Sequence, residues 1–266
     1  MTKYRYEEFT WPEIRQVVET KPVVVLPVGT IEQHGPHLPL LTDACTASEI
    51  SRLAVENIPG HALLMPTVFY AFNEHHLDFP GTIAIDTHPF INYVADIGKS
   101  LAHHGFQKIV IVNGHGSNVP FMDIAARTIT NRNQAICSLV SWWDLILPDV
   151  FKEIRESGFP GGMAHGCELE TSVMLFLRPD LVQMDKAEKD IHFEKSDFIF
   201  WDLQQASPVR YQEWFSRYSR TGTVGDPTKA NIDKGKKVVE AVADRLAKFL
   251  LEFQNRKINS RVDHHL

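Results

Sequence analysis

The sequence predicts an α/β fold in which a mostly parallel β-sheet is covered by helices on both faces. Runs such as KPVVVLPV at 21–28 and KIVIVN at 108–113 are apolar throughout, as in strands buried on both sides. Segments with apolar residues at helical spacing alternate with these runs, which is typical of parallel sheets. No linker and no internal repeat interrupts the pattern. We therefore expect one domain spanning residues 1–266 and organised as a three-layer sandwich.

The first half of the chain alternates strands and helices. Thr87 is a typical helix N-cap, and Gly105 is a typical residue just beyond a helix C-terminus. The expected elements are a strand over 21–28, a helix over 43–57, a strand over 61–68 and a helix over 87–105.

The second half continues the alternation and then becomes irregular. The segment 190–225 is rich in aromatic, Ser, Gly and Pro residues and has no clear period. The other expected elements are a strand over 108–113, a helix over 118–132, a strand over 135–142, a helix and Gly/Pro-rich loop over 143–167, and helices over 168–177 and 228–253.

Composition argues against several classes of function. The chain has 27 Lys and Arg against 33 Asp and Glu, a net charge of −6, so it carries no basic footprint for nucleic acid. The cluster Lys234, Lys236 and Lys237 is expected on the solvated face of a helix. No apolar run is long enough for a membrane span, and the N-terminal stretch lacks the apolar region of a signal peptide. Three cysteines, odd in number and widely spaced, favour a reducing compartment, so we expect a cytoplasmic protein.

The first strand leads into a segment that is unusually rich in both ionisable and apolar residues, LPVGTIEQHGPHLPLLTD at 26–43. In an extended chain, residues two apart point to the same side, so Glu32 and His34 can reach one small space. Asp43 follows a turn stiffened by prolines. Taken alone, the segment is explained better by capping roles for Glu32 and Asp43, with His34 as a polar turn residue.

Two further segments place ionisable groups at the ends of apolar elements. In VNGHGSN at 112–118, two glycines flank His115 at a strand end, whereas the pattern does not match a phosphate-binding loop. In AHGCELETS at 164–172, His165, Glu168 and Glu170 adjoin an apolar run, where an unpaired carboxylate would be costly. A salt bridge to Arg178 could explain one of these two glutamates.

A fourth segment, AFNEHHLDFPGT at 71–82, contains Glu74, His75 and His76 but lacks the spacing of a zincin helix. A substrate-facing loop, a subunit contact and metal ligation all remain open for it. Because ligands of such sheets bind at the carboxyl ends of the strands, the first three segments together favour one shared metal site. Two ions are the more economical interpretation, since a carboxylate can bridge a pair of ions.

These segments resemble the signature blocks of the creatininase (creatinine amidohydrolase) family. LPVGTIEQHGPHLPLLTD, NGHGSN and HGCELETSVML match in order, and FPGT, SWWD and TGTVGDPTKA fall where relatives have similar stretches. The resemblance covers nearly the whole chain and implies a creatininase-type three-layer sandwich.

The resemblance also implies two divalent ions per chain, zinc first, with manganese or iron as alternatives. Glu32, Asp43 and His115 would bind one ion, while His34, the shared Asp43 and a carboxylate would bind the other. Creatininase proper has that carboxylate two residues after the NGH histidine, where this chain has Ser117. Other branches take it from the third block, so Glu168 is the expected ligand.

The expected activity is hydrolysis of an amide-type C–N bond in a cyclic amide or formamide of a small molecule, with a hydroxide that bridges the metals. His165 is the candidate general acid/base and Glu168 its catalytic neighbour; the alternative for His165 is to orient Glu168. Trp142, Trp143 and the aromatic residues of 198–218 could wall the pocket. Alternatives are creatinine hydrolysis itself, hydrolysis of a cyclic diketone or inositol derivative, and non-catalytic metabolite binding. By resemblance the partners are a small-molecule substrate and five further copies of the chain, in a homohexamer.

Overall fold

The computed structural model describes residues 3–265. A four-stranded, fully parallel sheet has the order β2-β1-β3-β4. Its strands are β1 (Val23–Val28), β2 (Ala62–Leu64), β3 (Lys108–Asn113) and β4 (Ile136–Ser141). Val28 pairs with Asn113, so β1 and β3 end at the same level. The polar segments that follow these two strands therefore begin side by side.

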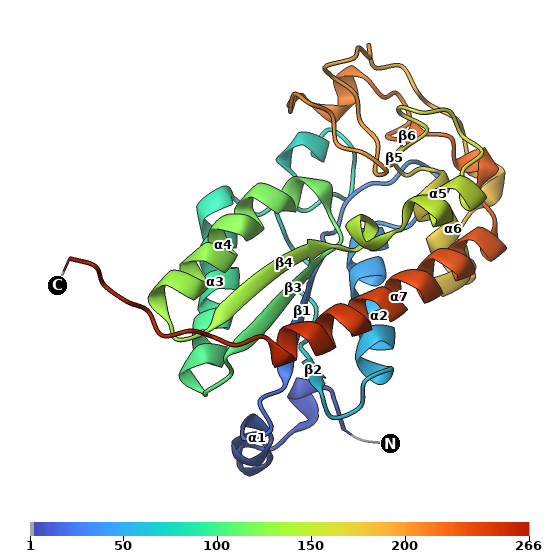
Figure 1. The fold of residues 1–266 in the computed structure, drawn as a ribbon. Helices are drawn as coiled ribbons and strands as arrows, with labels where there is room; N and C mark the ends of the chain where they lie inside the picture. Colours follow the sequence, from blue (N-terminus) through green and yellow to red (C-terminus); the bar gives the residue numbers. More distant parts are fainter. Residues whose placement is uncertain (1–2, 266) are drawn as a thin grey trace.

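Helices cover both faces of this sheet, which confirms the predicted three-layer α/β architecture (Figure 1). Val23 and Val25 of β1 pack against the helices of one face, whereas Val24 and Leu26 pack against those of the other. One layer contains α2 (Thr42–Glu56), α6 (Glu168–Leu177) and α7 (Ile232–Asn255), and the other contains α3 (Thr87–His103) and α4 (Val119–Arg132).

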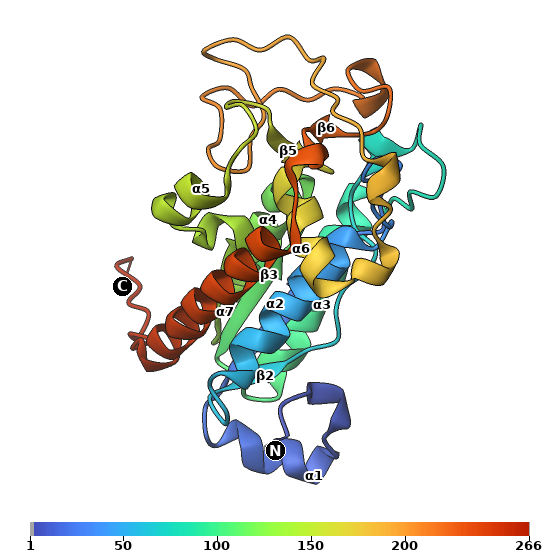
Figure 2. The same cartoon turned by 90° about the vertical axis from the view of Figure 1, so that its right-hand side faces the viewer.

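A separate pair of antiparallel strands, β5 (Met163–His165) and β6 (Val224–Gly225), lies beyond the carboxyl end of the sheet. The long segment between α6 and α7 arches over the same end, as both views show (Figure 1 and Figure 2). This segment is irregular, as expected from the lack of any helix or strand periodicity in the sequence of 190–225. This upper region thus covers the strand ends from which the predicted site residues emerge.

Several boundaries differ from the sequence-based expectation. Helix α1 (Trp11–Val18) was not predicted, although Thr10 and Glu13 form a capping box at its N-terminus. The strand expected over 61–68 is shorter, since Pro66 cannot donate a ladder hydrogen bond. The helix expected over 143–167 is limited to α5 (Pro148–Ile154). Asp86, and not Thr87, caps α3, because its carboxylate accepts the hydrogen bond from the Thr87 backbone.

Two aromatic residues expected at the pocket belong to the core instead. Trp142 is fully buried and Trp143 is 8% exposed, and both pack in the cluster between the sheet and α7. The two indole rings contact each other edge to face. They follow β4 directly and are buried among core residues that include Val238, Val242 and Leu246 of α7.

One lysine of the cluster Lys234, Lys236 and Lys237 is buried, whereas all three were expected on a solvated helix face. Lys234 is 9% exposed and its ammonium lies 2.6 Å from Glu168 Oε1. Lys236 and Lys237 do remain on the exposed side of α7. Residue 234 lies in the first turn of the helix, where α7 crosses the start of α6.

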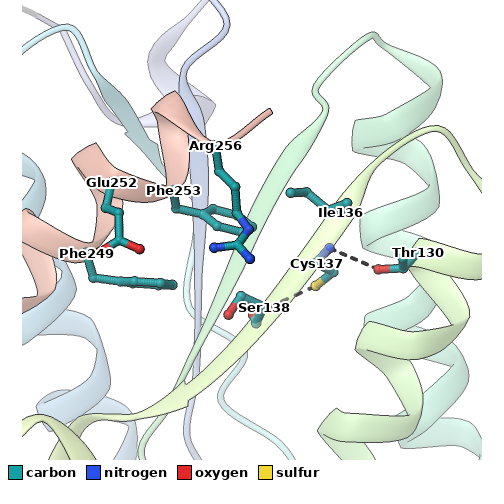
Figure 3. A pocket seen from close by; sticks show the side chains of 8 residues that line it. All are labelled: Thr130, Ile136, Cys137, Ser138, Phe249, Glu252, Phe253 and Arg256. Atoms are coloured by element: carbon teal, nitrogen blue, oxygen red, sulfur yellow. Dashed lines mark hydrogen bonds between the residues drawn. The ribbon is translucent and has the colours of Figure 1, made fainter. Parts of the chain in front are cut away.

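A cavity of about 400 Å³ lies between the start of β4 and the last turns of α7, at the opposite end of the sheet (Figure 3). Phe249, Phe253 and Arg256 line it from α7, while Cys137 and Ser138 line it from β4. It contains one carboxylate, Glu252, and no histidine. The ionisable residues singled out in the sequence, such as Glu32 and His115, lie at the other end of the sheet.

Candidate metal centre

Backbone geometry at two strand ends creates room for a buried cluster. A Cβ on Gly29 would lie 2.3 Å from Ala44 Cα, and a Cβ on Gly114 would lie 2.3 Å from the Asp43 carbonyl oxygen. Side chains at either position would collide with the first turn of α2. The two glycines therefore let α2 start directly against the ends of β1 and β3, and this contact brings Asp43 to the sheet.

Three carboxylates and three histidines meet at this point. Two groups of potential ligand atoms share one carboxylate: Glu32, Asp43 and His115 form the first, and His34, Asp43 and Glu170 form the second. Within each group, all ligand atoms lie within 4.8 Å of one another. A third group joins Glu32 and His34 to His165.

The cluster is almost completely buried. Glu32 and His34 are 0% exposed, Asp43 is 2%, and His115 and Glu170 are 5%. Asp43 lies between two imidazoles, 3.0 Å from His34 Nε2 through Oδ1 and 3.0 Å from His115 Nδ1 through Oδ2. His115 Nε2 is 3.2 Å from Glu32 Oε2.

Burial and mutual contacts shift the pKa values of these groups. Desolvation raises the pKa of Glu32 to about 8 and also raises that of Glu170. Burial opposes charge on His34, but the Asp43 carboxylate prevails and raises its pKa to about 10. For the carboxyl of Asp43, burial is likewise outweighed by His34 and His115, which hold its pKa below the usual range.

The cluster meets the requirements of a cation site. Glu32 Oε1 and Oε2, Asp43 Oδ2 and His115 Nε2 are buried without a hydrogen-bond partner among the described residues. Within residues 3–265, the ion-pair partners of Glu32, Asp43 and Glu170 are all histidines. Buried carboxylates of this kind are costly unless they are paired or bind metal, and carboxylate and imidazole are suitable ligands for zinc and related ions.

Glu168 does not join the cluster, which corrects its expected role as metal ligand and catalytic residue. Both its carboxylate oxygens accept hydrogen bonds from the Glu156 and Ser157 backbones, and Oε1 also binds the Lys234 ammonium. Successive residues of an α-helix are separated by about 100°, so positions 168 and 170 face nearly opposite directions. Glu170 faces the cluster, with Oε1 3.9 Å from His34 Nε2.

The alternative explanation for these glutamates also fails. Arg178 forms an exposed ion pair with Asp180 and contacts neither Glu168 nor Glu170. The buried cation that compensates Glu168 is Lys234, sixty-six residues away in the chain. Helical spacing alone could have shown that only one of the two glutamates faces the histidines, but it could not show which one.

His165 reaches the cluster from β5. Its Nε2 lies 2.7 Å from the backbone oxygen of Gln33, and its Nδ1 is 3.7 Å from Glu32 Oε1. Burial lowers the pKa of His165 well below the usual value, which favours the neutral ring. It therefore contacts Glu32 and not Glu168, the residue that it would orient in the alternative interpretation.

His76 is a site residue whose role the sequence left open. Its Nε2 is 3.4 Å from Glu32 Oε1, and its ring is 4.8 Å from that of His165. Phe215 stacks on the His76 ring at 4.1 Å. The aromatic wall predicted from 198–218 is thus present in part, through Phe215 and its neighbours Trp201 and Tyr218.

Three other polar residues surround the cluster without entering it. His37 Nε2 lies 2.8 Å from Thr171 Oγ1, and His75 Nε2 lies 3.0 Å from Ser117 Oγ. The Cys167 thiol is 3.6 Å from Glu170 Oε2, and burial raises its pKa well above the usual value. Cys167 is therefore a neutral neighbour of the cluster.

The chain matches a known family along nearly its whole length. The family model described as creatinine amidohydrolase matches residues 7–250. The chain belongs to the creatininase family. It is accordingly an enzyme of a hydrolase family, which confirms the resemblance found in its signature segments.

Named relatives in this family act on different compounds. The chain is 30% identical to creatinine amidohydrolase of Pseudomonas putida over 259 residues, covering 92% of this chain and 95% of that protein. It is also 30% identical over 242 residues to the mycofactocin precursor peptide peptidase of Mycobacterium tuberculosis, with coverages of 86% and 84%. Identity to the 3-dehydro-scyllo-inosose hydrolase of Thermotoga maritima is 26%, with coverages of 94% and 84%.

Solved creatininases have the same fold. A manganese form superposes with a TM-score of 0.80 at 28% identity, covering 96% of this chain and 100% of the other. A mutant creatininase of Zn-Zn type has a TM-score of 0.80 at 29% identity, with the same coverages. None of the helices described here has both the length and the apolar character needed to cross a membrane.

The neutral state of buried His37 predicts a pH-dependent stability. Burial lowers its pKa to about 4, below the ordinary 6.5 that applies to the unfolded chain. The unfolded state therefore binds protons more readily, and acidification from pH 6.5 to 4 should remove up to about 3 kcal/mol, at about 1.4 kcal/mol per pH unit. Urea unfolding of metal-free protein at pH 7, 5.5 and 4.5 measures this loss. His37→Gln should weaken the pH dependence, and equal slopes in the two proteins would contradict the assignment.

Proposed function

We propose that this enzyme hydrolyses an amide-type C–N bond of a small molecule with two divalent ions, one held by Glu32, Asp43 and His115 and one by His34, Asp43 and Glu170. The observation that carries the proposal is the pair of buried ligand groups that share Asp43 and contain partnerless oxygens. A carboxylate with one oxygen toward each group can bridge two ions about 3.5–4 Å apart.

When bound, such ions lower the pKa of a coordinated water toward neutrality and polarise the carbonyl group that is attacked. Zinc is our first choice, because each group combines imidazole nitrogen with carboxylate oxygen, and manganese or iron(II) suits the same ligands. The manganese and Zn-Zn forms of solved creatininases support this choice.

His165 is our candidate for proton transfer. Its Nδ1 faces Glu32, while its Nε2 contacts a backbone carbonyl. In hydrolysis, an oxygen from water bonds to the carbonyl carbon, the C–N bond breaks, and one proton of the water must reach the departing nitrogen. A neutral imidazole at this position can accept that proton and deliver it.

The aromatic wall supports a small, flat substrate. Trp201 and Phe215 are nearly parallel, with 6.3 Å between ring centroids, and Tyr218 contacts both. Cyclic amides and formamides fit this description. Ser117 stands where creatininase proper has a carboxylate, so creatinine is a weaker candidate, and a cyclic diketone related to inosose is a further alternative.

Metal analysis and a substrate panel test the proposal. Purified protein should contain close to two divalent ions per chain by mass spectrometry of the dissolved metals. The metal-replete protein should release amine or formate from cyclic amides or formamides, with creatinine and cyclic 1,3-diketones included for comparison. Protein that binds no ion without chelators, or turns over only diketones, would contradict the amidohydrolase assignment.

The choice of Glu170 over Glu168 makes a separate prediction. Glu170→Gln should lose one of the two ions, because the amide lacks the charge and the second anionic oxygen of the carboxylate. Glu168→Gln should keep both ions, since within residues 3–265 this side chain binds Lys234 and two backbone amides and no residue of the cluster. Metal analysis of both variants decides which glutamate is the ligand. If Glu168→Gln loses an ion and Glu170→Gln does not, the assignment would be reversed.

We also propose that the protein forms a homohexamer. Residues 1–266 would form a single domain, and the protein would be located in the cytoplasm. Exposed apolar side chains around the site support association: Phe69, Tyr70, Leu77 and Ile83 are each 45–51% exposed. The three free cysteines support a reducing compartment. Light scattering should give six times the chain mass of 30.3 kDa, and one unfolding transition is expected.

A further inference from the structure

Gln33 lies in the sequence between the proposed ligands Glu32 and His34. Its side chain contacts Gly35, Gly222 and His76. Gln33 as a whole is 6% exposed. The side-chain Oε1 accepts a hydrogen bond from the Gly35 backbone at 2.9 Å. This contact fixes the orientation of the amide, because only its oxygen can accept a proton from a backbone N–H.

The amide nitrogen of Gln33 consequently defines the tautomer of His76. Gln33 Nε2 donates to the Gly222 carbonyl at 3.0 Å and lies 2.8 Å from His76 Nδ1. An amide nitrogen can only donate, so His76 Nδ1 must be the acceptor in this contact. The ring proton of neutral His76 is then on Nε2, the nitrogen 3.4 Å from Glu32 Oε1.

His165 is held in the opposite tautomer. Its Nε2 lies 2.7 Å from the Gln33 backbone oxygen and 3.3 Å from Gln33 Nε2. The backbone oxygen can only accept, and the two hydrogens of the Gln33 amide serve the shorter contacts to Gly222 and His76, so His165 Nε2 carries the proton. The free lone pair is on Nδ1, 3.7 Å from the same Glu32 Oε1. Two histidines thus approach one carboxylate oxygen, one with an N–H group and the other with a lone pair.

The surroundings of His76 favour a strong interaction through its N–H group. The residue is 1% exposed, and Phe215 covers its ring at 4.1 Å. A preorganised donor in a site without bulk water stabilises developing negative charge far better than one in water. During hydrolysis of an amide, this charge develops on the carbonyl oxygen.

We infer that His76 is an additional catalytic residue, held by Gln33 with its proton on Nε2, which donates a hydrogen bond to the carbonyl oxygen as that oxygen becomes negative. His165 takes the proton from water through Nδ1 and passes it to the departing nitrogen, while His76 keeps its own proton throughout. This inference rests on the proposed function and assigns a division of labour within the same site.

The tautomers can be measured without a substrate. Protein labelled with ¹⁵N-histidine, metal-free and zinc-loaded, should show a bare Nδ1 and a protonated Nε2 for His76, assigned by comparison with His76→Gln. Magic-angle spinning of sedimented protein suits any oligomer. Gln33→Met should abolish the fixed tautomer of His76, because Nδ1 loses its donor. A proton on Nδ1 of His76 in the wild type would overturn the inference.

The catalytic role needs the compound from the substrate panel that the wild type hydrolyses. His76→Leu should lower kcat about 10²- to 10³-fold, as for loss of one oxyanion donor, with KM changed little and both ions retained. His76→Gln should recover much of this loss, since its amide N–H can occupy the position of Nε2. Leucine at the exposed position His103 is the matched control.

The outcomes separate the two proposals. Full kcat in His76→Leu, or equal loss in the leucine and glutamine variants, would overturn the role of His76 while leaving the hydrolase assignment intact. If the wild type hydrolyses nothing in the panel, the proposed function fails and the catalytic role fails with it. The measured tautomer would still decide whether Gln33 orients the His76 ring.

Discussion

Asp43→Ala is expected to lose both metal ions and to reduce hydrolysis by about four orders of magnitude or more, equivalent to roughly 5.5 kcal/mol of barrier. Asp43 belongs to both ligand groups, with Oδ1 near His34 and Oδ2 near His115. No other residue of the cluster can substitute for it, because its position depends on the contact between α2 and the two strand ends. Metal analysis and the rate measured in the substrate panel provide the test.

A matched variant on the same helix controls for general damage to the fold. Glu49→Ala also removes a carboxylate from α2, but that side chain is partly exposed and pairs with Arg52. It should retain both ions and nearly full activity. If Asp43→Ala folds normally and still binds one ion at full occupancy, Asp43 is not shared and the two-ion proposal must be revised.

Lys234→Met is expected to destabilise the protein by about 3–5 kcal/mol, which is the usual cost of leaving one partner of a buried ion pair unpaired. The ammonium of Lys234 contacts Glu168 Oε1 at 2.6 Å, Glu156 Oε1 at 2.7 Å and the Lys229 carbonyl at 2.7 Å. Its loss leaves the fully buried Glu168 carboxylate with backbone amides as its remaining partners. Urea unfolding at pH 7 measures the change.

Two further variants separate this pair from general effects of charge. Lys237→Met removes an exposed lysine of the same helix, which pairs with Glu153, and should cost less than about 1 kcal/mol. The double variant Lys234→Met/Glu168→Gln should recover part of the loss, because the uncompensated charge is gone. A small effect of Lys234→Met alone would show that Glu168 does not need its cation.

Much of the fold followed from the sequence because its signals are local. The wholly apolar runs at 21–28 and 108–113 indicate strands buried on both faces, and their parallel pairing brings the polar segments that follow them to one edge. This edge predicted that the polar segments carrying Glu32, His34, Asp43 and His115 meet, whereas the resemblance to the creatininase family implied that these four residues are metal ligands. The structure brings these four residues together.

The remaining features depend on contacts between distant segments. Whether Glu168 or Glu170 faces the histidines is decided by Lys234 on α7, and nothing local identifies that lysine as buried. His76 and its partner Gln33 meet across 43 residues of chain. Trp142 looks the same in sequence whether it lines a pocket or fills the space beneath α7, and only the packing of that helix distinguishes the two.

The close approach of α2 at Gly29 and Gly114 has a consequence for how this centre can change in evolution. Since the first helical turn rests on the backbone of two paired strands, the distance from Asp43 to the residues after β1 and β3 is set by main-chain register and not by side-chain rotamers. The region above the sheet, formed by β5, β6 and the segment between α6 and α7, consists by contrast mainly of loops with few backbone hydrogen bonds between strands. Mutation can therefore reshape this region while the spacing of Glu32, Asp43 and His115 stays constant. Relatives at 26–30% identity that are named for creatinine, a mycofactocin precursor peptide and an inosose are what such a separation would produce.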